Sequence, residues 1–152
     1  MKSPSAEAQL AGFLAQYMPE VAAVARAARK KLQAILPGAV EMVYDNYNAL
    51  VIGFGPTERT SEAIMSMALY PRWVNVFFLA GAALPDPHGI LKGSGKIVRH
   101  IRLDDASILD RPEVRDLIAA AIDDADKPFD PKSPRRLIIK SVSARQRARR
   151  PA

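Results

Sequence analysis

The chain contains no cysteine. This absence excludes disulfides, thiolate catalysis and any site in which cysteine binds zinc or an iron–sulfur cluster. The first residues also lack the apolar core of a secretory signal peptide. The longest apolar stretch, residues 73–84, is interrupted by Asn75 and is much shorter than the ~20 residues that span a bilayer. These absences predict a soluble, cytoplasmic protein that does not enter a membrane.

Motifs of catalysis are missing as well. The only histidines are His88 and His100, and no nucleophile elbow, HExxH motif, flanked carboxylate pair or dinucleotide fingerprint is present. The sequence therefore favours a non-enzymatic protein without a cofactor, and an enzyme is the least supported class.

The body of the chain has no net positive charge once its end is set aside. The net charge is +6, from 22 basic and 16 acidic residues. Residues 131–152 hold eight of the basic residues and no acidic one, so residues 1–130 carry a net charge of −2. The basic pI of the chain belongs to the tail. It therefore does not indicate that the whole fold binds nucleic acid.

What is present indicates a single α+β domain, because 152 residues fit one domain. Apolar residues at helical spacing predict a helix that starts at Ser3–Ser5, a second from Pro19, and a third that starts at Asp110. Between them, period-two alternation and turn residues predict a five-stranded, mostly antiparallel curved sheet. The β-branched run 136–142 is typical of a further, late strand. The predicted strands cover residues 40–45, 49–54, 64–70, 73–79 and 97–103. In the first of them Val40, Met42 and Tyr44 alternate with Glu41 and Asp45, as in a half-buried strand.

Several segments of this chain resemble the YdhG-like family. They are YDNYNALVIGFGP at 44–56, MALYPRWVNVFF at 67–78, GKIVRH at 95–100 and IIKSVSARQRARR at 138–150. The resemblance implies one YdhG-like domain over residues 1–143, with a small curved antiparallel sheet packed against helices. One member of the family is described as a frataxin-like iron chaperone, so the resemblance also implies iron binding as an alternative function.

The glycine-rich run Gly93-Ser94-Gly95-Lys96 is the first candidate site. Glycines permit close approach of the backbone, and amides beside a lysine can bind an anion. It is not a Walker A loop, because Ile97 follows the lysine and a strand comes next. On that strand the side chains of Lys96 and His100 lie on the same side. Arg99 lies on the other side among apolar residues, a position that pairing with another group or binding of a ligand would explain. The alternative is a glycine hairpin with solvated side chains. The candidate residues for a small anionic ligand or a protein partner, on the concave side of the sheet, are Arg72, Lys96, Arg99, His100 and Lys140.

Acidic residues of the third helix form the second candidate. Carboxylates can bind hard cations, and Glu113, Asp116, Asp123 and Asp124 are the candidate metal ligands, with iron as the metal that the resemblance suggests. The alternative is the solvated face of an amphipathic helix.

The end of the chain is the third candidate. Residues 144–152 are predicted to be a disordered basic tail, and cations without acidic neighbours can contact phosphates regardless of sequence. The residues for weak nucleic-acid association are Arg145, Arg147, Arg149 and Arg150; a solubilising end is the alternative.

The aromatic residues of the sheet could stack bases or pack in the core, and Phe77 and Phe78 must point to opposite faces. The oligomeric state, monomer or homodimer, stays open.

Overall fold

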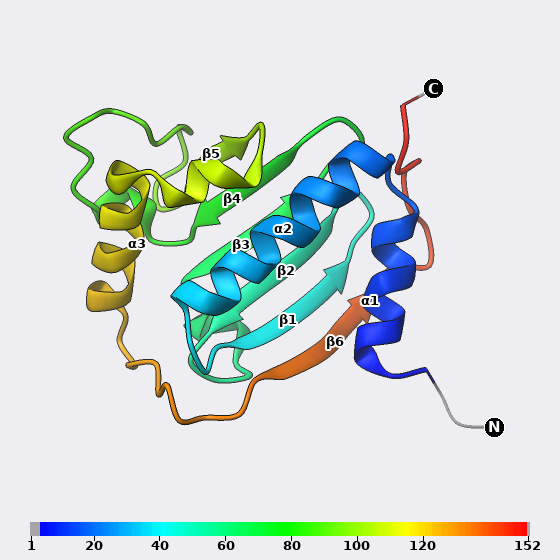
Figure 1. Ribbon diagram of the computed structural model, residues 1–152, viewed down its shortest axis with the longest axis horizontal. Coiled ribbons are helices and arrows are strands. Elements are labelled where there is room, and N and C mark those ends of the chain that lie inside the picture. Colours follow the sequence, from blue (N-terminus) through cyan, green and yellow to red (C-terminus); the bar gives the residue numbers. More distant parts are fainter. Residues whose placement is uncertain (1–3, 152) are drawn as a thin grey trace.

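The computed structural model describes residues 4–151 and consists of one six-stranded sheet with helices packed on it (Figure 1). The strand order is β5-β4-β3-β2-β1-β6. Neighbouring strands are antiparallel except β1 and β6, which run parallel. The elements are α1 (Ala6–Ala15), α2 (Pro19–Ile35), β1 (Val40–Asp45), β2 (Leu50–Gly55), η1 (Thr60–Glu62), β3 (Met65–Leu69), β4 (Val74–Phe78), η2 (Gly81–Ala83), β5 (Arg99–Leu103), η3 (Ala106–Asp110), α3 (Pro112–Asp124) and β6 (Arg136–Val142).

The predicted α+β class and the two N-terminal helices are confirmed. The meander of five strands is also confirmed, and the late strand 136–142 joins it as β6 beside β1. Ser5, within the predicted start of the first helix, caps α1, with its Oγ accepting a hydrogen bond from Ala8 N. One helix boundary differs. The third helix begins at Pro112, because Asp110 ends η3 and its carboxylate binds Lys31 and Arg115 instead of capping a helix.

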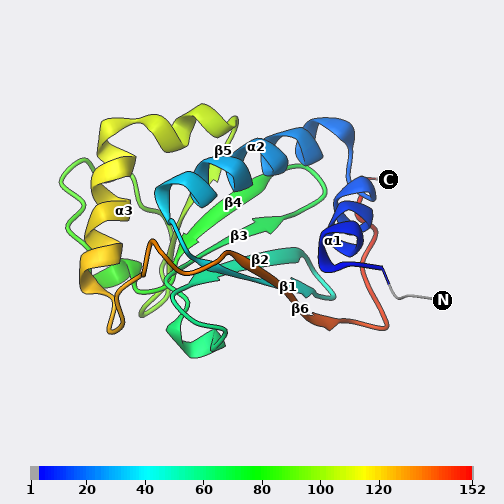
Figure 2. The same cartoon turned by 60° about the horizontal axis from the view of Figure 1, so that its bottom comes forward.

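Helix α2 lies across one face of the sheet, and the sheet curves toward it (Figures 1 and 2). Its buried face is rich in alanine, with Ala22, Ala25 and Ala28 at 2% exposure or less, which lets the helix approach the strands closely. Opposite it lie the apolar side chains of alternate strand positions, such as Ile52, Met67 and Val76. The concave face, where the sequence predicted a ligand site, is therefore filled by a helix. No helix of the described chain has the length and apolarity to cross a membrane.

Strand β1 departs most from its predicted character. The alternation predicted that Val40, Met42 and Tyr44 face the core while Glu41 and Asp45 face solvent. In the structure Glu41 and Asp45 are 3% and 2% exposed and lie on the helix-covered face, since their register partners are the core residues Phe54 and Leu50. Both faces of β1 are thus buried, and its two carboxylates must be neutralised inside the protein.

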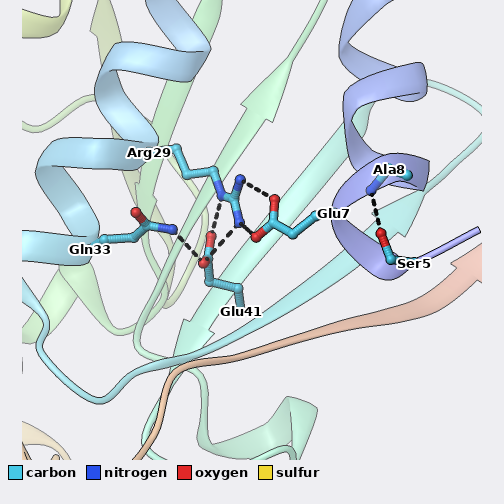
Figure 3. A network of polar contacts seen from close by, with 6 residues as sticks. All are labelled: Ser5, Glu7, Ala8, Arg29, Gln33 and Glu41. Carbon is cyan, nitrogen blue, oxygen red and sulfur yellow. Dashed lines mark hydrogen bonds and ion pairs between the residues drawn. The ribbon is translucent and has the colours of Figure 1, made fainter.

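Arg29 of α2 neutralises Glu41 (Figure 3). Its Nε donates to Glu41 Oε2 at 2.6 Å, and its two Nη atoms bind the carboxylate of Glu7 on α1 at 2.8 and 3.1 Å. Gln33 Nε2 also donates to Glu41 Oε1 at 2.8 Å. Burial alone would lower the pKa of Arg29, but hydrogen bonds to Glu7 and Glu41 outweigh it and keep the pKa above its ordinary value. One guanidinium therefore ties α1, α2 and β1 together.

Arg149 neutralises Asp45, and this corrects the prediction that residues 144–152 are disordered. The Arg149 side chain is 5% exposed, and its Nη2 donates to Asp45 Oδ1 at 2.9 Å and to the carbonyl of Asn46. Beside it, Arg150 Nε donates to the carbonyl of Gln16 at the C-terminal end of α1. The segment 143–151 therefore packs against the β1–β2 turn and α1; Ala152 lies outside the described residues.

We expect Arg29→Met to lower the free energy of unfolding by about 3–5 kcal/mol, because it leaves Glu41 buried without a cation. Arg26→Met is the matched control. It lies on the exposed side of the same helix, and we expect a change within about 0.5 kcal/mol. Urea denaturation followed by circular dichroism measures both. Similar losses for the two variants would contradict the role of Arg29.

Candidate functional site

The face of the sheet opposite α2 carries a row of basic and aromatic side chains on β4 and β5. Register pairs Phe77 with His100 and Asn75 with Arg102, so these four side chains share that face while Val74, Val76 and Phe78 point into the core. The Phe77 and His100 rings contact each other with centroids 5.5 Å apart. The prediction that Phe77 and Phe78 separate to opposite faces is confirmed.

The loop 84–98 adds a cation at the edge of this row. Lys92 N and His100 N each donate to the other's carbonyl, at 2.8 and 2.9 Å, in an antiparallel bridge outside β5. Opposite residues in such a bridge project to the same face. The exposed Lys92 side chain therefore lies beside His100, on the side of β5 away from Phe77.

The other end of the row is formed by Arg102 and Trp73. The Arg102 guanidinium lies 5.1 Å from the centre of the Trp73 ring, a cation–π contact. Arg102 also forms an exposed ion pair with Asp104 at 3.6 Å, and Trp73 is 36% exposed. We call the five residues Trp73, Phe77, Lys92, His100 and Arg102 the basic–aromatic strip.

The structure brings only part of the predicted anion site together. Lys96 and Arg99 lie in or beside the loop that joins Lys92 to His100. Arg72 lies in the β3–β4 turn, at the far end of β4 beside Trp73, and Lys140 lies on β6, at the opposite edge of the sheet. The five predicted residues therefore do not form one site.

Arg99 differs from its neighbours because it turns back onto the loop. Its Nη1 donates to the carbonyls of Val98, at 2.9 Å, and Gly95. The predicted pairing of this arginine is therefore with main-chain carbonyls. Strand β5 begins at Arg99 rather than Ile97, and Lys96 is exposed in the loop rather than on the strand.

Only His100 of the strip was among the predicted site residues; Trp73, Phe77, Lys92 and Arg102 were not selected. Phe77 carried a partial signal, because alternation requires it and Phe78 to face opposite ways, so that one of the two can lie outside the core. Arg102 lies two residues from His100, so alternation places both on one face of the strand. Lys92 carried no signal, since its bridge to His100 depends on the path of an irregular loop.

The acidic candidates do not converge on a metal. All four lie on α3, with Glu113 and Asp116 in its first half and Asp123 and Asp124 at its C-terminal end. Within residues 4–151, no three histidine, aspartate or glutamate side chains are grouped so as to hold a metal ion.

Three of the four tail arginines have partners in the fold. Arg149 is buried, Arg150 binds the end of α1, and Arg147 lies 5.5 Å from the centre of the Tyr47 ring. Arg145 is exposed. The segment is thus a structural element, and Arg149 is inaccessible to a phosphate.

Comparison with protein-family models, curated proteins and solved structures found no match to this chain. The YdhG-like resemblance therefore stays a prediction, and the function is argued below from geometry alone.

The base of the loop that carries Lys92 is seated tightly on β5 at Gly81. A Cβ at Gly81 would lie 2.6 Å from Arg99 Cβ and 3.1 Å from Phe78 Cβ. We therefore expect Gly81→Ala to destabilise the protein by about 1–3 kcal/mol through overpacking. The control Gly12→Ala places its Cβ in open space in α1 and should stabilise by about 0.5–1 kcal/mol. Thermal unfolding measures both, and a neutral Gly81→Ala would show that η2 is not fixed on β5.

Proposed function

We propose that this chain is a non-enzymatic binding domain that holds single-stranded nucleic acid along the basic–aromatic strip. The observation that carries the proposal is the register of β4 and β5, which sets Phe77, His100 and Arg102 on the face opposite α2, with Lys92 alongside. Figure 2 shows that the segment with η1 lies on that side beneath β1 and β2, away from β5. Trp73, Lys92 and Arg102 of the strip are exposed, and Phe77 and His100 are half-buried.

The side chains of the strip match the chemistry of a single strand. Bases stack on aromatic rings for about 1–3 kcal/mol each, whatever their sequence, and arginine adds cation–π contacts. Lys92, His100 and Arg102 supply donors for phosphates, with Lys96 exposed on the adjoining loop. Asp104, the acidic partner of Arg102, is 79% exposed and is free to swing away.

Spacing favours an extended strand over a small anion. Trp73 and Phe77 are four residues apart, about 13 Å along an extended chain. One base cannot stack on both rings, whereas two bases of a strand can. A small anion would instead need a concave pocket lined by convergent donors.

The sole tryptophan of the chain, Trp73, reports binding directly. We expect a thymidylate oligonucleotide of ten residues to quench its fluorescence saturably, with an affinity that falls as salt rises. Lys92→Ala should reduce the slope of log affinity against log salt by about 0.7, the value for one lost phosphate contact on a single strand. Phe77→Ala should weaken binding about tenfold or more by removing a stacking surface.

Lys132→Ala is the matched control, because Lys132 is an exposed lysine in the connection to β6 and is remote from the strip. It should leave both affinity and slope unchanged. The proposal fails if Lys132→Ala and Lys92→Ala have equal effects or if the oligonucleotide does not bind. If adenosine monophosphate binds tightly and the oligonucleotide does not bind, the ligand of the strip is a small anion and not single-stranded nucleic acid.

A further inference from the structure

A second site, independent of the strip, lies between α3 and η1. It is a cavity of about 520 Å³, within the range of roughly 300–1,000 Å³ typical of small-molecule sites. Its lining is mixed, and the apolar part comes from the ends of β3 and β4, the loop after η2 and the last turn of α3. The apolar lining residues include Ile64, Phe78, Leu84, Ala121 and Ala125.

The rim of the cavity is polar and carries a net negative charge. Glu62, Asp124, Asp126 and Lys127 line it together with the hydroxyl residues Thr60 and Ser61. Lys127 Nζ pairs with Glu62 Oε2 at 3.3 Å, so these two charges cancel. Within residues 4–151, neither Asp124 nor Asp126 has an ion-pair partner. Two carboxylates are therefore left uncompensated at the mouth.

Glu62 is held in one orientation at this rim. Its Oε1 accepts a hydrogen bond from Thr57 Oγ1 at 2.6 Å, and its side chain is 16% exposed. This hydrogen bond, with the pairing to Lys127, keeps the pKa of Glu62 below its ordinary value. Glu62 thus keeps its negative charge, and its pairing with Lys127, at neutral pH.

The position of the rim at the end of α3 strengthens its negative potential. The C-terminal end of a helix carries a partial negative charge, which basic side chains normally offset. Helix α3 has no basic residue in its last turn and ends instead in Asp123 and Asp124. A cation placed at the mouth of the cavity relieves this accumulation of negative charge.

We infer that the cavity binds a small organic cation, with an apolar body about the size of one aromatic ring inside the cavity and an ammonium group beside Asp124 and Asp126. The volume and apolar walls accommodate the body, and the uncompensated carboxylates select the charge. A neutral or anionic molecule of the same shape lacks the attraction between an ammonium group and the carboxylates of Asp124 and Asp126.

Three ring compounds of matched size test this inference: phenethylamine, 2-phenylethanol and 3-phenylpropionate. Each is titrated into the full chain labelled with ¹⁵N and followed by amide chemical shifts. We expect phenethylamine to shift the amides of Ala121 and Ala125 saturably and to bind more tightly than the alcohol, with the carboxylate weakest. Ala125→Leu, which fills the mouth, should abolish these shifts.

Two double variants that remove the same number of charges distinguish a local effect at the cavity from an effect of net charge. Asp124→Asn with Asp126→Asn should weaken phenethylamine binding about tenfold, as expected for two partly exposed ion pairs. Asp116→Asn with Asp123→Asn removes the same charge from residues of α3 that do not line the cavity and should weaken binding less than about twofold. Equal effects of the two pairs, equal affinity for amine and alcohol, or shifts outside the cavity would each overturn the inference. Because no strip residue lines the cavity, none of these outcomes bears on nucleic-acid binding.

Discussion

The structure depends on the neutralisation of two carboxylates buried on β1. A strand that points Glu41 and Asp45 toward the helices is stable only if cations reach both, since an unpaired buried charge costs several kcal/mol. The cations come from Arg29 of α2 and Arg149 near the C-terminus. This requirement fixes where α2 crosses the sheet and where the chain end packs.

The same requirement explains why one face of the sheet remains available. Arg29 also binds Glu7, and Arg150 binds the carbonyls that end α1, so both N-terminal helices are held on the side of Glu41 and Asp45 (Figure 3). The opposite face carries the basic and aromatic side chains of β4 and β5, with Arg102 exposed and Phe77 and His100 half-buried. The cavity beside α3 lies apart from both and is lined by α3, η1, the ends of β3 and β4 and the loop after η2.

Local patterns in the sequence predict the elements well and their partners poorly. Helical spacing and turn residues placed the helices and all six strands within a few residues, because these signals are local. The buried acids of β1 were assigned to solvent, since their arginine partners are 12 and 104 residues away along the chain. The tail was predicted to be disordered for the same reason: its composition is that of a solvated segment, and only the fold supplies the carboxylate that buries Arg149. Of the strip only His100 was predicted, because alternation gives faces but not the bridge from Lys92 to His100.

A double-mutant cycle on Asp45 and Arg149 tests the central claim most directly. The variants Asp45→Asn, Arg149→Met and their combination are compared by urea unfolding. If the pair neutralises β1, Arg149→Met alone should cost about 3–5 kcal/mol, and the double variant should cost little more, because no charge is left buried. Strictly additive losses, or a cost for Arg149→Met below about 0.5 kcal/mol, as expected for an exposed arginine, would contradict the claim that the chain end neutralises and anchors β1.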